Sequence, residues 1–125
     1  MNKTISSIIT LLAILFMTGC VQPKPLYVYG DYNERYYEAK REPSAESDLK
    51  LQKSIEKAIQ NIDGSSSGRA APGMYANLGY IYLKGGKTNE AIVSFKKEKA
   101  SYPESTYFMN RMIKKVEASQ GTKND

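Results

Sequence analysis

The 125-residue sequence predicts an all-α fold: an antiparallel pair of helices with flanking helices, a small α-solenoid fragment that follows a cleaved signal peptide. Three observations predict it. Apolar residues recur at three- and four-residue intervals after residue 31, which is the spacing of amphipathic helices. Glycine and proline residues separate these segments where helices would end. The apolar run at the N-terminus is well short of the ~20 residues that a membrane-spanning helix needs.

The N-terminal segment has the organisation of a secretory signal peptide. Lys3 is its only charged residue, residues 5–17 are mostly apolar, and small residues follow. Residues 17–20, Met-Thr-Gly-Cys, resemble the lipobox of bacterial lipoproteins, in which Leu is the usual first residue. The resemblance implies a signal peptide at 1–19, cleavage before Cys20 and a covalent lipid on the Cys20 sulfur, with no other cofactor. An ordinary signal peptide with a chance cysteine, or an uncleaved anchor helix, is the alternative.

A lipid on Cys20 would decide the compartment. Two acyl chains hold a protein firmly at a membrane, whereas one chain holds it marginally. Val21 stands where Asp commonly retains lipoproteins at the inner membrane of enteric-type bacteria. In a Gram-negative cell we therefore expect a lipid-anchored protein on the periplasmic face of the outer membrane. Export makes nucleic acid an unexpected partner despite the net charge of +5.

The residue inventory argues against an enzyme. The chain has no His and one Cys, which excludes imidazole catalysis, a His metal site and a thiolate cluster. A cell-wall hydrolase would need a pair of carboxylates in a cleft. Glu98 and Glu104 are the acidic residues considered for that role, but we expect them to form ion pairs with Lys97 and Lys99.

The segment after Cys20 begins with a short Pro-containing tether, residues 20–30. A helix is predicted from the N-cap Asp31 to about Arg41, because Pro43 cannot continue it. Half of the ten tyrosines lie in residues 26–43, and two of them, four apart, would share a helix face. The cluster could pack in the core, contact a partner or rest at lipid headgroups. Its members are Tyr27, Tyr29, Tyr32, Tyr36 and Tyr37.

A second helix is predicted from the N-cap Ser44 to about Asp63, where Gly64 stops it. Its apolar residues follow the spacing of an amphipathic helix. These are Leu51, Ile55, Ala58, Ile59 and Ile62. Residues 64–73, GSSSGRAAPG, are predicted to be a flexible loop.

The most informative segment is residues 72–105. Its spacing predicts helices at 73–84 and 88–101 that pack antiparallel, with Gly79 allowing close approach, Ala91 facing it and Pro103 ending the second helix. The pattern resembles the tetratricopeptide (TPR) repeat of about 34 residues. Glu98 departs from the small residue usual in that family. The matching positions are Tyr75, Leu78, Gly79, Tyr82, Ala91, Phe95 and Pro103.

A last helix is predicted at 104–118, which would cap the helical domain of residues 31–118. Residues 119–125 are predicted to be a flexible tail. The apolar face expected to pack consists of Phe108, Met109, Met112, Ile113 and Val116.

The order of the segments is also similar to a narrower group. The stretches PLYVYGDY, APGMYANLGYIY and FKKEKASYPESTYFMNRM, after a lipobox, resemble an uncharacterised family of small bacterial lipoproteins with a TPR-like repeat. Members of that family tend to be encoded beside a lipoprotein similar to the curli secretion channel. The resemblance implies a role in envelope assembly, with such a lipoprotein as the candidate partner, and no known reaction.

Two groups of residues are candidates for binding a partner. Asn77, Tyr80 and Lys84 lie opposite the packing stripe of their helix, on the side that holds peptides in TPR proteins. The alternative is that Tyr80 packs on a neighbouring helix and Lys84 is solvated. The second group is Tyr29, Tyr32 and Tyr36 of the tyrosine cluster.

These features predict a periplasmic lipoprotein that serves as a protein–protein interaction adaptor or assembly factor for an envelope complex. Two alternatives remain: a peptidoglycan hydrolase or an activator of one, and a structural envelope lipoprotein without a specific client.

Overall fold

The computed structural model describes residues 22–121, so the predicted signal peptide and Cys20 lie outside the described residues. Within residues 22–121 all regular structure is helical, which confirms the all-α prediction. None of the described helices is long and apolar enough to cross a membrane. The elements are α2 (Tyr32–Arg41), α3 (Ala45–Gln60), the 3₁₀ turn η1 (Ile62–Gly64), α4 (Met74–Lys84), α5 (Thr88–Ser101), the 3₁₀ turn η2 (Pro103–Ser105) and α6 (Thr106–Gly121).

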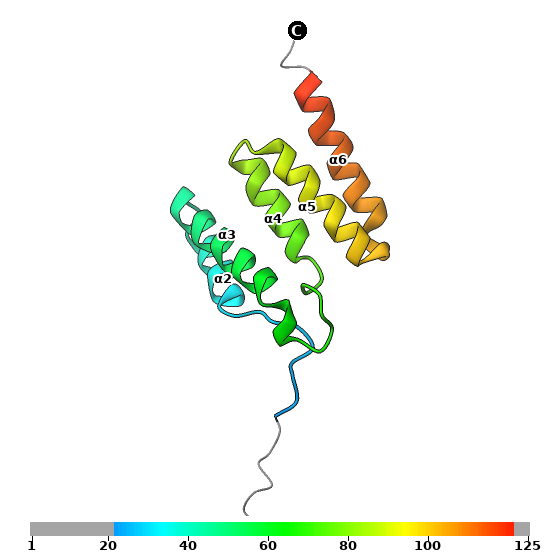
Figure 1. Ribbon diagram of the computed structural model, residues 1–125. Helices are drawn as coiled ribbons and strands as arrows, with labels where there is room; N and C mark the ends of the chain where they lie inside the picture. The colour runs from blue at the N-terminus through cyan, green and yellow to red at the C-terminus, as the bar shows by residue number, and fades with distance from the viewer. Residues whose placement is uncertain (1–21, 122–125) are drawn as a thin grey trace, which may run out of the picture.

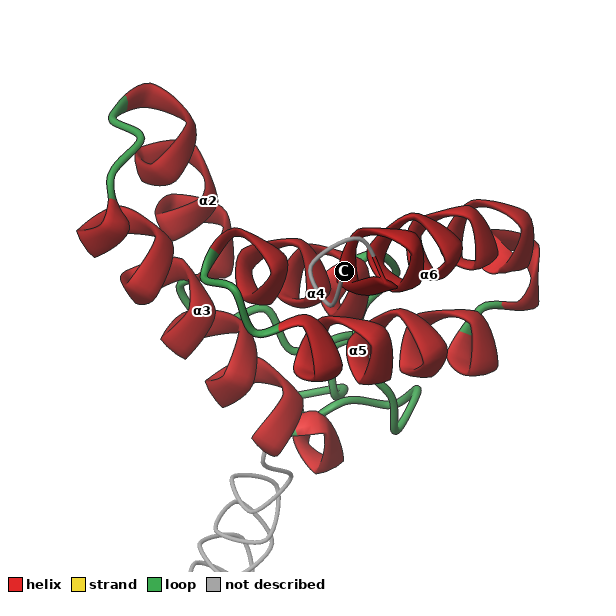
Figure 2. Ribbon diagram, turned by 90° about the horizontal axis from the view of Figure 1, so that it is seen from above, coloured by secondary structure: helices red, strands yellow, loops and turns green. Residues whose placement is uncertain are grey.

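Successive helices stack side by side along the molecule (Figure 1). Seen from above, α2, α4 and α6 lie on one side of the stack, and α3 and α5 lie on the other (Figure 2). The predicted antiparallel pair is α4 and α5, with α2 and α3 before it and α6 after it.

The α2–α3 corner is built from a well-formed cap. Ser44 accepts a hydrogen bond from the Ser47 N–H and its own N–H donates to Ser47 Oγ, both at 3.0 Å, which is a capping box. Asp31 precedes α2 as predicted, but its side chain makes no capping bond. It accepts instead from Ser54 Oγ, at 2.7 Å, and from Arg35 Nε, at 3.3 Å.

The stack has two apolar cores. The first joins α3 to α4, and the second joins α5 to α6. Ile59 and Ile62 pack against the first core, and Met112 against the second, as partly buried side chains. The prediction that Phe108 belongs to the packed face is wrong, because this residue is 59 % exposed. The buried members are Leu51, Ile55, Ala58, Ala70, Ala71, Met74, Leu78 and Ile81 in the first core, and Ala91, Phe95, Met109, Ile113 and Val116 in the second.

The close approach of α4 and α5 depends on Gly79. A Cβ at this position would lie 2.6 Å from Phe95 Cε1 and 3.1 Å from the Ala91 carbonyl oxygen. Ala91 and Phe95 are almost completely buried, so the space is filled by one aromatic ring. Gly86, with φ +74°, then turns the chain into α5. The predicted roles of Gly79 and Ala91 are therefore confirmed.

The loop at residues 64–73 is packed, in contrast to the flexible loop predicted. Ala70 and Ala71 are buried in the first core. Tyr102 is also buried, and its hydroxyl donates a 2.6 Å hydrogen bond to the Ala70 carbonyl oxygen, while the Arg69 guanidinium lies 4.7 Å from the centre of its ring. Small serine and alanine residues suggest flexibility in a sequence, but here they allow a close-fitting turn.

Part of the predicted tether lies against this loop. The N–H groups of Ser66 and Ser67 donate to the carbonyl oxygens of Pro25 and Leu26, at 2.8 and 3.3 Å. Lys24 donates to the Asp63 carbonyl oxygen at 3.0 Å. Residues 24–26 are thus attached to the helical body.

The last helix is longer than predicted. It continues through residues 119–121, which the sequence interpretation placed in a flexible tail, while residues 122–125 lie outside the described residues. Gln120 explains the extension, because its side-chain amide donates to Thr88 Oγ1 at the start of α5.

Candidate functional site

A pocket of about 160 Å³ opens between α2, α3 and α4. It brings together four of the predicted partner-binding residues: Tyr36 from the tyrosine cluster, and Asn77, Tyr80 and Lys84 from α4. The two candidate groups, which lie about forty residues apart in the chain, therefore contribute to one site. The remaining lining residues are Ala39, Lys40, Pro43, Asp48, Leu51 and Ile81.

The pocket combines an apolar base with an aromatic rim. Leu51 and Ile81 are buried members of the first core. Tyr36 is half-buried and packs against that core, whereas Tyr80 is 53 % exposed. The interpretation of Tyr80 as a packed side chain is therefore wrong, and its ring is available to a partner.

Two lysines give the pocket its charge. Lys84 pairs with Asp48 of α3, and its ammonium lies 6.0 Å from the centre of the Tyr80 ring. Lys40 lies 5.4 Å from the centre of the Tyr36 ring and makes no ion pair within the described chain. The lining therefore contains two lysines and one acidic residue, Asp48, which leaves a net charge of +1. Each lysine follows its tyrosine by four residues, one helical turn, which places the cation over the ring.

Asn77 and Tyr32 join α2 to α4 beside the pocket. The Asn77 amide donates a 2.6 Å hydrogen bond to the Tyr32 hydroxyl. Burial raises the pKa of Tyr32 above its usual range. Because their polar atoms bond to each other, we assign these two residues to positioning the helices rather than to free contact with a partner.

The tyrosine cluster divides between the core and the surface. Tyr27, Tyr32 and Tyr36 pack against the first core, whereas Tyr29 and Tyr37 are 39 % and 72 % exposed. Neighbouring rings in the series lie 5.8 to 6.4 Å apart between centroids, so the cluster is one continuous aromatic strip. Tyr29 does not line the pocket.

Tyr82 connects the α4–α5 pair to α3. It packs against both cores, and its hydroxyl donates to Glu56 Oε1 at 2.8 Å. Burial, followed by this hydrogen bond, raises the pKa of Tyr82 to about 12. Tyr75 is half-buried beneath Lys97, whose ammonium lies 5.6 Å from the centre of its ring.

Glu98 has a role that sequence reasoning missed. It is 3 % exposed, and its carboxylate accepts hydrogen bonds from the N–H groups of Gly73 at 2.7 Å and Ala76 at 3.3 Å. The residue therefore caps the start of α4 from the neighbouring helix, where the helix dipole favours a negative charge. The expected ion pairs with Lys97 and Lys99 do not form in the described chain; Lys99 donates instead to the side chain of Asn110.

The cap explains why Glu98 departs from the small residue of the repeat pattern. Gly73, the N-cap residue of α4, is in a left-handed conformation with φ +84°, and it has no side chain to cap the helix. A carboxylate on α5 supplies what the local sequence lacks. Glu104 is exposed, so the two acidic residues do not form a carboxylate pair in a cleft. The sequence did contain a clue to this role: Glu98 is an acidic residue at a position where the repeat pattern usually has a small one.

Comparison with known proteins gives one match. Residues 26–112 match a family described as a domain of unknown function, DUF4810. The chain belongs to the DUF4810 family. No curated protein and no solved structure matches the chain. The DUF4810 region begins at Leu26, where the N-terminal segment attaches to the body, and it includes every residue that lines the pocket.

Three polar or rigid residues of the DUF4810 pocket were not predicted: Lys40, Pro43 and Asp48. Lys40 was recognisable, because it follows Tyr36 by the same four residues that separate Lys84 from Tyr80. Asp48 was not, since its position opposite α4 depends on how α3 crosses that helix. Within residues 22–121, the DUF4810 chain has no group of three metal-ligating side chains that could hold an ion.

Proposed function

We propose that this protein is a membrane-anchored periplasmic lipoprotein that acts as an adaptor or assembly factor, binding another envelope protein through the pocket between α2, α3 and α4. In this proposal Cys20 carries the lipid and the outer membrane is the site of attachment. The lipobox-like residues 17–20 and the signal-like segment before them support the anchor.

The exposed ring of Tyr80 beside Lys84 is the observation that carries the proposal. An exposed tyrosine at a partly apolar pocket is typical of the positions that dominate protein–protein binding, and the ammonium of Lys84 can pair with a carboxylate of a partner. The volume of about 160 Å³ is smaller than the 300 to 1,000 Å³ typical of small-molecule sites. A side chain or two of a partner protein would fit such a pocket, whereas a drug-sized ligand would not.

We also propose that α4 and α5 form a single TPR-like repeat. Gly79, Ala91 and Phe95 support this, because they pack as the spacing of that repeat requires. A single repeat cannot cover its own faces, so α3 and α6 act as its neighbours.

The partner proposed is an envelope protein, and the family resemblance makes a lipoprotein similar to the curli secretion channel the first candidate. Nothing favours the other functions considered, a peptidoglycan hydrolase, an activator of one or a structural lipoprotein without a client. The carboxylate of Glu98, which a hydrolase would need, accepts two backbone hydrogen bonds.

Site-specific crosslinking in intact cells tests the adaptor role. A photoreactive amino acid replaces Tyr80, and a matched chain carries it at Lys53, an exposed position of α3 outside the pocket. We expect one defined protein adduct from position 80, lost when Lys84→Glu is added, and none from position 53. Recovery of no protein adduct from position 80 would contradict the adaptor function.

The anchor has its own test, which does not depend on the partner. Cys20→Ser should abolish lipidation and processing of the chain. In detergent partitioning, the variant should therefore behave differently from the lipidated parent protein. Metabolic labelling with a radioactive fatty acid should mark the parent chain and not the variant. Equal labelling of the two chains would exclude Cys20 as the lipid site.

A further inference from the structure

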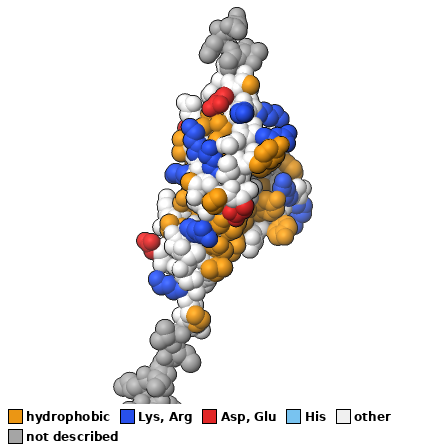
Figure 3. Space-filling view, turned by 90° about the vertical axis from the view of Figure 1, so that its right-hand side faces the viewer, with side chains coloured by type: hydrophobic (Ala, Val, Ile, Leu, Met, Phe, Trp, Pro, Cys, Tyr) orange, Lys and Arg blue, Asp and Glu red, His pale blue; other side chains and the backbone are white. Residues whose placement is uncertain are grey.

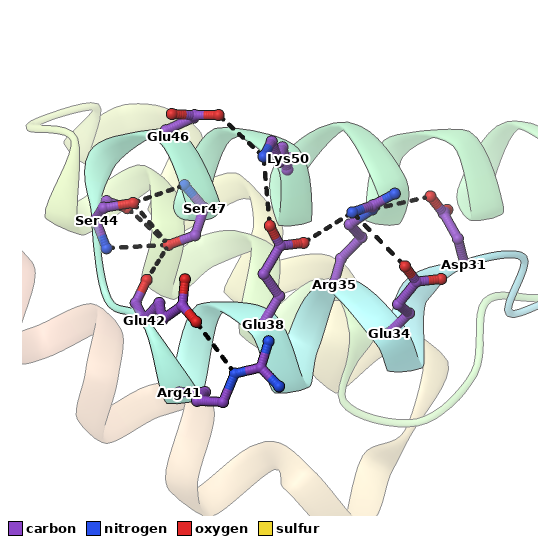
Figure 4. A network of polar contacts seen from close by, with 10 residues as sticks. All are labelled: Asp31, Glu34, Arg35, Glu38, Arg41, Glu42, Ser44, Glu46, Ser47 and Lys50. Atoms are coloured by element: carbon purple, nitrogen blue, oxygen red, sulfur yellow. Dashed lines mark hydrogen bonds and ion pairs between the residues drawn. The ribbon is translucent and has the colours of Figure 1, made fainter.

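The two ends of the helical stack differ in how they are closed. At the α2–α3 end, charged side chains pair with one another (Figure 4). Glu38 accepts from Arg35 at 2.7 Å and from Lys50 at 3.3 Å, and Lys50 also pairs with Glu46. These pairs neutralise Arg35, Glu38, Glu46 and Lys50 within the chain. Terminal repeats of helical stacks normally carry a polar outer face of this kind.

The α6 end lacks such a closure. Tyr107 and Phe108 are 76 % and 59 % exposed, which is unusual for two adjacent aromatic residues on an outer helix. The Arg111 guanidinium lies 5.9 Å from the centre of the Tyr107 ring, and Lys114 and Lys115 are exposed one turn further on. We call these five residues the α6 surface. The side of the molecule that carries α6 shows hydrophobic side chains among Lys and Arg, with few acidic ones (Figure 3).

The net charge differs in sign between the two halves of the helical domain. Residues 31–63 contain six basic and eight acidic side chains, a balance of −2, whereas residues 69–117 contain nine basic and four acidic, a balance of +5. Every ion pair in residues 22–121 includes an acidic side chain of residues 31–48. The cations of α5 and α6 therefore have no acidic partner in the described chain.

We propose that the α6 surface is a second docking site, separate from the pocket, and that its occupant is an acidic amphipathic segment of a partner protein. The apolar side of such a segment would cover Tyr107 and Phe108. Its carboxylates would pair with Arg111, Lys114 and Lys115. Aromatic anchors flanked by unneutralised cations match that combination of charge and hydrophobicity.

A second copy of this chain fits the surface less well. Two α6 surfaces facing each other would bring their unpaired cations together, which is unfavourable. The opposite end of a second copy offers acidic side chains such as Glu38 that are already paired with cations of their own chain.

Binding of a designed peptide to the full chain in mild detergent tests the proposal. The probe is an amphipathic peptide of about 18 residues with Glu on one face and Leu and Phe on the other. Control peptides replace every Glu by Lys or scramble the order. Fluorescence anisotropy should show binding of the acidic amphipathic peptide alone, and this binding should weaken as salt screens the cations.

Two pairs of variants separate the apolar and the charged contributions. The double variant Y107S/F108S should weaken binding at least tenfold, whereas Tyr37→Ser, which removes an equally exposed aromatic from α2, should change it less than twofold. The α6 charge reversal K114E/K115E should also weaken binding at least tenfold. The control is K53E/K57E on α3, which makes the same change in net charge and should have little effect on peptide binding.

Three outcomes would overturn the proposal. The first is failure of the acidic peptide to bind, or binding that the α6 variants do not alter. The second is binding to vesicles of anionic phospholipid that K114E/K115E abolishes while the peptide does not bind, which would make the surface a lipid contact. The third is self-association of the parent chain, measured by sedimentation, that Y107S/F108S abolishes. Tyr80→Ala, which alters the pocket, should leave peptide binding unchanged, so this test is independent of the proposed adaptor site.

Discussion

Replacing Gly79 with Ala should destabilise the fold, although alanine is the better helix former. The new Cβ would lie 2.6 Å from Phe95 Cε1 and 2.8 Å from Cδ1, where ordinary contacts begin at 3.4 Å. Phe95 is 1 % exposed, so its ring cannot rotate into solvent, and the Ala91 carbonyl oxygen lies 3.1 Å from the added atom. Both obstacles are fixed parts of the second core, so α4 and α5 must move apart.

The magnitude follows from two opposing terms. Inserting a methyl group into a well-packed core costs about 1 to 3 kcal/mol, and a site bounded by a buried ring and a backbone atom belongs at the upper end. Gly to Ala within a helix gains about 1 kcal/mol. We therefore expect the free energy of unfolding to fall by about 2 kcal/mol, which corresponds to a fall in Tm of roughly 10 °C for a domain of this size.

Urea denaturation of the full chain in mild detergent, followed by far-ultraviolet circular dichroism, measures this change. The matched control is Gly85→Ala at the end of α4, where the nearest atom is 3.5 Å from the added Cβ and φ is −80°, so stability should hardly change. A double-mutant cycle with Phe95→Leu gives a second check. Gly79→Ala should cost less stability in a chain that carries Phe95→Leu than in the parent chain, because the smaller side chain makes room for the methyl group. A Gly79→Ala chain as stable as the parent would refute the close-packing argument.

Three further predictions concern polar groups. Glu98→Ala should destabilise the fold by about 2 kcal/mol and Glu98→Gln by less, because hydrogen bonds to a charged group contribute about 1.5 to 3 kcal/mol and the amide keeps one acceptor; urea titration of both variants checks the order. The hydrogen bond from Ser54 lowers the pKa of Asp31. The stabilisation of the fold by this carboxylate is therefore present above the usual Asp pKa of about 3.9 and is lost as the pH falls through the lowered value. Carboxyl NMR of Ser54→Ala should show a higher pKa for Asp31 than in the parent chain. The pKa of Tyr82, about 12, lies above its value in the unfolded chain, so its contribution is complete below about pH 10 and is lost as the pH rises through 12. Phenolate absorbance should show this late ionisation, and Glu56→Gln should lower it; an unchanged Tyr82 pKa in that variant would show that burial alone sets it.

The helices were predictable because their signals are local. The cap of Ser44, the glycine turn before α5 and the stop at Pro103 each depend on a few neighbouring residues. The close contact at Gly79 was also predictable, although Phe95 lies sixteen residues away, since a small residue facing an aromatic on the next helix is a packing signature that spacing preserves.

The site was predictable only in part, because it depends on how separate segments cross. The sequence indicated Tyr36 and Tyr80 as candidates, but their meeting in one pocket requires the angle between α2 and α4, which no local pattern encodes. Glu98 shows the same limit. Its partners are backbone N–H groups of a helix start more than twenty residues earlier, and backbone groups leave no trace in a sequence.

The attachment of the N-terminal segment determines how far the proposed lipid anchor would lie from the helical body. Ser66 and Ser67 hold the chain at Pro25 and Leu26, so only residues 20–24 separate a lipid on Cys20 from the body. Five residues span at most about 17 Å. Such a short connection would keep the helical stack close to the membrane, whereas α6 ends on the side of the molecule away from residue 22 (Figure 1). Lengthening the tether should therefore change how far a partner bound to the α6 surface can reach from the membrane, without altering its affinity for the detergent-solubilised chain.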